Sequence, residues 1–176
     1  LVGSEMCIRD SSVTDRYDLM NDLMSLGTHR IMKQLTVEMA TVREGYRVLD
    51  LASGTGDLAA RLAPAVGDGG QVVMCDINAS MLGAGRDRML DRGLVIDSVQ
   101  ADAECLPFPD ETFHCVTMAF GLRNVTDKAR ALGAIRRTLR PRGQLVVLEF
   151  SKPRHLPVQK AYGCLLYTSD AADEST

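Results

Sequence analysis

The sequence predicts an α/β domain in which a doubly wound, mostly parallel sheet lies between layers of helices. Two observations support this fold class: short Val- and Leu-rich runs alternate with segments of helical periodicity, and the runs themselves are continuously apolar. Strands that alternate with helices form βαβ units, and strands covered on both faces need no polar positions. With 176 residues, 45% of them hydrophobic, the chain can bury one such core.

Helices and strands alternate along the first half of the chain. The expected elements are, in order, helices over 16–26 and 28–41, a strand over 47–52, a helix over 57–66, a strand over 71–77 and a helix over 79–92. In the second helix Ile31, Leu35 and Met39 recur at helical spacing. Gly93 ends the last of these helices.

The same alternation continues through the second half. The expected elements are a strand over 95–102, a Pro-containing loop over 104–112, a strand over 113–120, a helix over 127–139 and a strand over 144–150. We expect the inner face of the helix to carry Leu132, Ile135 and Leu139. The Pro-Arg-Gly segment at 141–143 predicts a turn before the last strand.

Composition narrows the function classes. The formal net charge of -3 at pH 7 gives no reason to expect nucleic acid as a partner, and the basic segment 136–142 is typical of a solvated helix end. No run approaches the about 20 apolar residues of a membrane-spanning helix, and no secretory signal is visible. The five cysteines lack metal-binding spacing, so we expect reduced thiols, no metal site and a cytoplasmic protein.

The two ends differ from the sequence between them. Segments 1–12 and 164–176 resemble translated adapter sequence, so we treat them as non-native tails outside the fold. The domain is then expected over 13–163, with the native protein interrupted near Gly163 and the last strands of its sheet missing. Frayed native termini are the alternative interpretation.

The stretch "YRVLDLASGTGDLAARL" breaks an apolar strand into a glycine-containing bend and then enters a helix. In Rossmann-like sheets a ligand lies beyond the carboxyl ends of the strands, where the strand order reverses. Asp76 ends the second strand, 20 positions after Gly56, where a carboxylate can accept both hydroxyls of a ribose. Asp102 ends the third strand, beside the expected base. The pattern predicts a bound nucleoside.

The bend alone does not identify the nucleotide. Gly54, Gly56 and Ala59 are compatible with the dinucleotide pattern G-x-G-x-x-G, so NAD stays possible. Asp57 argues against it, because a carboxylate at a helix start repels a pyrophosphate. Together with Asp50 it favours a cationic ligand without phosphate, such as S-adenosylmethionine. A helix-capping Asp57 and a hydrogen-bonded Asp50 are the structural alternatives.

The segment "VLDLASGTGDL" is similar to the first motif of class I S-adenosylmethionine-dependent methyltransferases. Five further blocks, "YDLMNDLMSLGTHR", "DINASML", "QADAECLPFPDETF", "FGLRNVTD" and "LVVLEFSKP", resemble the ubiquinone/menaquinone biosynthesis C-methyltransferases in order and spacing. The resemblance covers about residues 15–162. It implies the class I methyltransferase fold, two strands of which would be missing here.

The resemblance implies cofactor contacts at Thr55, Asp76, Asp102 and Ala103. The full set expected around the cofactor is Asp50, Ser53, Gly54, Thr55, Gly56, Asp57, Asp76, Ile77, Asp102, Ala103 and Ala119. The sequence departs from the family at three positions: Ser53 replaces a common glycine, His114 a common aspartate, and Ala119 a serine that often contacts the cofactor. We interpret His114 as a strand-edge residue.

The implied reaction methylates a ring carbon of a polyprenyl quinol, either demethylmenaquinol or 2-methoxy-6-polyprenyl-1,4-benzoquinol, and releases S-adenosylhomocysteine. A phenol with a pKa of about 10 must lose its proton to activate that carbon. We expect Arg123 to stabilise the phenolate, with an ion pair to Asp127 as the structural alternative, and Asn124 to orient a ring oxygen. His29 and Tyr17 are candidate proton acceptors.

A lipid acceptor implies a cytoplasmic enzyme that makes transient contact with the inner membrane surface, as a homo-oligomer or in a biosynthetic complex. Three alternatives stay open at this point: another small-molecule S-adenosylmethionine methyltransferase, a nicotinamide-dependent oxidoreductase, and a truncated domain that binds the cofactor without turnover.

Overall fold

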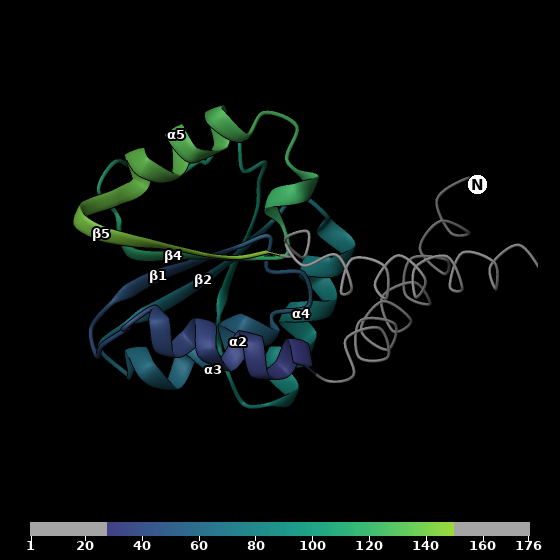
Figure 1. Cartoon of the computed structure of the whole chain (residues 1–176). Coiled ribbons are helices and arrows are strands. Elements are labelled where there is room, and N and C mark those ends of the chain that lie inside the picture. Colours follow the sequence, from purple (N-terminus) through teal and green to yellow (C-terminus); the bar gives the residue numbers. More distant parts are fainter. Residues whose placement is uncertain (1–27, 150–176) are drawn as a thin grey trace, which may run out of the picture.

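The computed structural model describes residues 28–149 of the chain, and a five-stranded sheet forms their centre (Figure 1). The strands are β1 (Arg47–Leu51), β2 (Gln71–Asp76), β3 (Asp97–Gln100), β4 (Phe113–Ala119) and β5 (Leu139–Leu148). Every neighbouring pair is parallel, in the order β3-β2-β1-β4-β5. The chain builds outward from β1 to β3 and then returns to the other side of β1, so the strand order reverses between β1 and β4.

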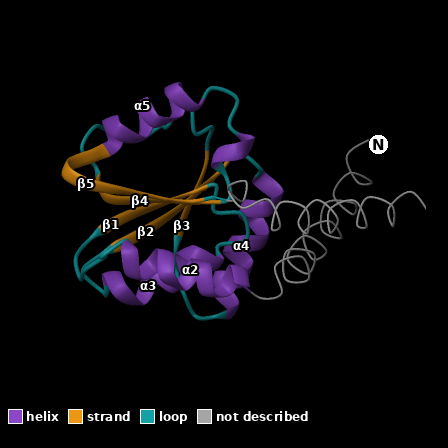
Figure 2. Cartoon of the chain, viewed as in Figure 1, coloured by secondary structure: helices purple, strands orange, loops and turns teal. Residues whose placement is uncertain are grey.

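Helices cover both faces of this sheet, as Figure 2 shows. They are α2 (Thr28–Met39), α3 (Asp57–Val66), α4 (Ala79–Asp91) and α5 (Lys128–Thr138), with a 3-10 turn, η1 (Leu122–Asn124). One face packs against α3 and α4, with α2 beside them, and the other packs against α5. Successive residues of β1 alternate between the two cores, Val48 in one and Leu49 in the other. The doubly wound prediction is therefore confirmed.

Local sequence explains where these helices begin. Asn78 caps α4, because its side-chain oxygen accepts hydrogen bonds from the backbone N–H groups of Ser80 and Met81. Asp127 caps α5 by accepting one from Arg130 N–H. Within α3 the buried side chains recur at helical spacing: Leu58, Ala59, Leu62 and Val66.

Two details of the predicted second half are wrong. β5 begins at Leu139 rather than at 144, and the expected turn lies within the strand as an irregularity, where the partners jump from Phe113↔Leu139 to Cys115↔Gln144. Leu132 does not face the core, since 41% of it is exposed. Ile135 is buried as predicted, together with Ala131 and Thr138 on the same face of α5.

The helix predicted over 28–41 is confirmed as α2, although its apolar stripe faces outward. Ile31, Leu35 and Met39 are exposed by 64%, 50% and 66%, whereas Thr36 and Ala40 are buried. The helix expected over 16–26 lies outside the described residues. Among residues 28–149, no helix has both the length and the hydropathy required to cross a bilayer.

Candidate functional site

The bend after β1 has a backbone that only glycine adopts without strain. Gly54 and Gly56 have φ values of 53° and 76°, and α3 begins immediately afterwards at Asp57. A Cβ on Gly56 would also approach the sulfur of Met74 to 2.9 Å. The bend therefore brings the backbone and the start of α3 to the carboxyl edge of the sheet, as the sequence predicts.

Asp76, at the carboxyl end of β2, holds this bend in place. One oxygen of its carboxylate accepts a hydrogen bond from Gly54 N–H at 2.8 Å, and the other accepts one from Asn78 N–H at 2.9 Å. Ser53 N–H donates to the carbonyl of Cys75 at 3.1 Å. A carboxylate oxygen can accept a second hydrogen bond, so Asp76 can still receive the hydroxyls of a ribose.

Asp50 lies beneath the bend and is only 1% exposed. Its Oδ1 accepts a hydrogen bond from the Thr117 hydroxyl at 2.9 Å. Its Oδ2 is buried, and no described residue donates a well-formed hydrogen bond to it. Burial raises the pKa of Asp50 to about 7, against the opposing effects of Thr117 and Lys33. The hydroxyl of Ser53 is a second buried oxygen without a partner in the described part of the chain.

Asp57, the first residue of α3, is neutralised by two cations. Its carboxylate lies 3.1 Å from the Lys33 ammonium and 3.6 Å from Nε of Arg61. Partial burial would raise the pKa of Asp57, yet these two cations and the more distant Arg88 together outweigh it, and the pKa is lowered. Because its charge is compensated, the argument that Asp57 alone repels a pyrophosphate loses most of its force. Sequence reasoning missed Lys33, which lies on α2 and far from Asp57 along the chain.

The loop after β3 adds a third aspartate at the same edge. Ala101 N–H donates to the carbonyl of Asp76 at 3.1 Å, which joins the ends of β2 and β3. Asp102 is exposed, and its Oδ1 accepts a hydrogen bond from Glu104 N–H at 2.9 Å. Ala103 is half-buried next to it. Asp50, Asp76 and Asp102 thus occupy the carboxyl ends of three adjacent strands, as predicted.

Two residues with a strained backbone follow the adjacent strands where the strand order reverses. Ala52 after β1 and Phe120 after β4 have φ values of 55° and 57°, which are unfavourable for residues with a side chain. A Cβ on Gly121 would clash with the side chain of Ala52, so the two chain segments are in close contact. Such strain is concentrated at functional sites. Ala119, the last residue of β4, is half-buried at this edge.

Arg123 lies at the same edge and forms an ion pair, but not with Asp127. Its Nη1 is 2.8 Å from Oε1 of Glu149, and its backbone N–H donates to Oε2 at 3.1 Å. Its guanidinium also lies 5.8 Å from the centre of the Phe120 ring. Sequence reasoning missed Glu149, although its place after the fifth strand, beside the fourth, was a signal for it.

The remaining predicted residues lie as follows. Asn124 is exposed in η1, and Ile77 is 63% exposed after β2. His29 belongs to α2, but its side chain is not described, and Tyr17 lies outside the described residues. His114 is the second residue of β4, at the amino ends of the strands and away from the bend, where its ring stacks on Tyr46 at 4.6 Å and accepts a hydrogen bond from Arg47 N–H at 2.9 Å.

Comparison with known proteins agrees with this geometry. Residues 8–169 match the model of the ubiE/COQ5 methyltransferase family. The "Ubiquinone/menaquinone biosynthesis C-methyltransferase UbiE" of Cellvibrio japonicus is 60% identical over 153 residues, which are 86% of this chain and 61% of the relative. The protein of the same name from Pseudomonas entomophila is also 60% identical, over 86% of this chain and 60% of the relative. The chain therefore spans about three fifths of the length of these relatives.

A solved structure confirms the fold independently. The S-adenosylmethionine-dependent methyltransferase of Aquifex aeolicus superimposes with a TM-score of 0.69, over 89% of this chain and 86% of that one, at 20% identity. The matched family consists of methyltransferases and not of nicotinamide-dependent oxidoreductases. Since the family model matches most of the chain, and the bend and the aspartates lie where the resemblance implies, this protein belongs to the ubiE/COQ5 methyltransferase family.

Proposed function

We propose that this chain binds S-adenosylmethionine and carries the methyl-transfer site of an enzyme that methylates a ring carbon of a polyprenyl quinol. The observation that carries the proposal is the group of three aspartates, Asp50, Asp76 and Asp102, around a glycine bend where the strand order reverses. The names of the relatives support the choice of acceptor.

The residues at the bend fit this cofactor. Buried polar atoms without partners are unfavourable, so Asp50 Oδ2 and the Ser53 hydroxyl would gain from a donor supplied there, directly or through one ordered water. Asp76 would take the ribose hydroxyls, and Asp102 and Ala103 would lie beside the base. When bound, S-adenosylmethionine supplies an electrophilic methyl group on a sulfonium.

Arg123 has the chemistry needed on the acceptor side. The ring carbon becomes nucleophilic when the neighbouring phenol ionises, and a guanidinium close to that oxygen lowers its pKa from about 10. The pair with Glu149 keeps Arg123 at the carboxyl edge of β4. Asn124, exposed in the same turn, would orient a second ring oxygen. His29 and Tyr17 stay our candidates for accepting the proton.

A polyprenyl acceptor is dissolved in a membrane, so the proposal includes contact with a membrane surface during turnover. Another small-molecule acceptor is the second candidate, because this fold serves many acceptors. The acceptor must therefore be tested separately from the cofactor.

Cofactor binding is tested on the chain itself by calorimetry, with S-adenosylmethionine and NADH titrated in parallel. We expect heat only with the former, and Asp76→Ala should abolish it. Transfer is tested on a hybrid in which this chain replaces the matching 153 residues of the Cellvibrio japonicus relative. Given methyl-labelled cofactor and each demethylated quinol, the hybrid should label the quinol ring. Absence of label, while the relative itself is active, would refute the acceptor assignment.

A further inference from the structure

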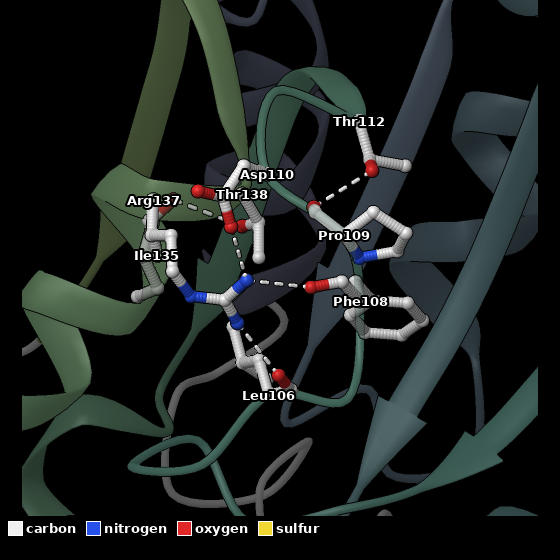
Figure 3. A network of polar contacts seen from close by, with 8 residues as sticks. All are labelled: Leu106, Phe108, Pro109, Asp110, Thr112, Ile135, Arg137 and Thr138. Carbon is white, nitrogen blue, oxygen red and sulfur yellow. Dashed lines mark hydrogen bonds and ion pairs between the residues drawn. The ribbon is translucent and has the colours of Figure 1, made fainter.

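Arg137, in the last turn of α5, binds three points of one loop (Figure 3). Its Nη2 donates to the carbonyl of Leu106 at 2.8 Å, and its Nη1 donates to the carbonyl of Phe108 and to a carboxylate oxygen of Asp110, both at 2.7 Å. A planar guanidinium holds five N–H donors on a wide, rigid group, whereas a lysine has three donors on a single nitrogen. The guanidinium of Arg137 therefore binds the loop, although the basic segment 136–142 to which it belongs was expected to be solvated.

The loop runs from β3 to β4, and backbone hydrogen bonds fix its two ends, from Ala101 N–H to Asp76 and from Thr112 N–H to Thr138. Leu106 is only 4% exposed, and the ring of Phe108 lies edge-on to Phe113 with 5.0 Å between ring centres. The Thr112 hydroxyl donates to the carbonyl of Pro109 at 2.8 Å, at the end of the loop (Figure 3). The carbonyls bound by Arg137 thus lie on the middle of a loop that packs on the sheet.

A second contact joins the same loop to the other end of α5. Glu104 accepts a hydrogen bond from Asp127 N–H at 2.8 Å, through Oε1. The backbone N–H of Glu104 in turn donates to Oδ1 of Asp102 at 2.9 Å. Two successive hydrogen bonds therefore lead from the first turn of α5 to an aspartate of the candidate cofactor site.

We infer that α5 acts as a clamp on the loop over 101–112, and that Arg137 and Glu104 are positioning residues for S-adenosylmethionine binding. The inference rests on the proposed function. Neither residue needs to touch the cofactor: both hold the loop that carries Asp102 and Ala103 in its binding conformation. If the loop is already ordered before the ligand binds, binding does not carry the entropic cost of ordering it, and the affinity is higher.

The test uses the whole chain and a matched pair of arginines. Arg137→Met removes the three side-chain contacts of Arg137 with the loop, whereas Arg136→Met removes the neighbouring, exposed guanidinium, for which no hydrogen bond or ion pair is found within residues 28–149. We expect the dissociation constant for S-adenosylmethionine to rise about tenfold in Arg137→Met, to rise less in Arg137→Lys, and to stay unchanged in Arg136→Met. Equal affinity of wild type and both Arg137 variants would overturn the inference.

Hydrogen exchange separates positioning from general destabilisation. Without ligand, Arg137→Met should speed exchange of the amides at 101–112 while leaving those of β1 and β2 protected, and S-adenosylmethionine should restore protection. Uniformly faster exchange across the sheet would show a merely structural role and contradict the clamp. The ligand-free comparison needs no cofactor, so it tests the clamp even if wild type fails to bind S-adenosylmethionine. That failure would refute the proposed function and not the clamp.

Discussion

The ammonium of Lys33 lies 3.1 Å from the carboxylate of Asp57, so α2 is fastened to the first residue of α3, directly after the glycine bend. Both side chains are mostly buried, with 18% and 20% of their surfaces exposed. Lys33 also acts on Asp50 beneath the bend, whose pKa it helps to lower against burial. One cation from α2 thus interacts with two aspartates at the start of the candidate cofactor site.

Removing that cation should weaken the domain. We expect Lys33→Met to lower the free energy of unfolding by about 0.5–2 kcal/mol, because Asp57 then loses its shortest ion pair and keeps the longer contact with Arg61. Urea denaturation of the variant and of Arg92→Met, which removes an exposed cation at the end of α4, measures the effect. Equal stability of the two variants would show that the pair contributes nothing.

Arg123 should depend on Glu149 for its proposed role in methyl transfer. Glu149→Gln keeps an oxygen that can accept from the guanidinium but loses the charge that holds it. We expect kcat of the hybrid enzyme to fall about tenfold, with unchanged affinity for S-adenosylmethionine. The same steady-state kinetics on Glu38→Gln, an exposed change on α2, should match wild type. A loss of cofactor affinity in Glu149→Gln, with kcat retained, would contradict this role.

The fold could be predicted because its signals are local. Apolar runs indicated most of the strands, and the predicted alternation of strands and helices along the chain is the one observed. The errors arose where a contact outside the segment decides the outcome. Leu132 was expected inside because its spacing allowed it, yet α5 packs on the sheet through Ala131, Ile135 and Thr138. The strand β5 extends back to Leu139 because it pairs there with Phe113.

In the candidate site, too, the features set by nearby sequence could be predicted, and those set by distant segments were missed. The aspartates at the ends of β1, β2 and β3 could be predicted, since parallel strands bring their carboxyl ends to one edge. The ion pairs at this edge were missed, because Lys33 and Glu149 come from segments far from their partners in the sequence, and only for Glu149 did the neighbouring strands offer a signal. Asp57 shows the consequence: its charge was predicted correctly, but not the two cations that compensate it.

The glycine bend can be tested with a matched pair of glycines. Gly56 has a φ of 76° and a Cβ there would meet Met74, whereas Gly83 lies inside α4 with open space around it. We expect Gly56→Ala to destabilise the domain by about 1–3 kcal/mol and to weaken S-adenosylmethionine binding. Gly83→Ala should stabilise it by about 0.5–1 kcal/mol. Thermal unfolding and calorimetry on both variants measure this, and equal effects would contradict the assigned backbone requirement.

Asp50 should make stability depend on pH. Its pKa is raised from 3.8 to about 7 in the folded state, so between these values the folded chain binds a proton that the unfolded chain has released. Its contribution is therefore fully present below about pH 4 and is lost as pH rises through about 7. Asp50→Asn cannot ionise and keeps an oxygen for the Thr117 hydroxyl, so it should be more stable than wild type at pH 8, by on the order of 2–4 kcal/mol.

Urea denaturation at pH 5 and pH 8 measures this difference for wild type and Asp50→Asn. The advantage of the variant should shrink at pH 5, where the Asp50 carboxyl of the folded protein is protonated. Asp97→Asn, at the start of β3 and exposed, is the matched control and should show no comparable change between the two pH values. If the advantage of Asp50→Asn is the same at both, the buried carboxyl does not titrate between them, and Oδ2 of Asp50 must be stabilised as an anion by a donor at the bend.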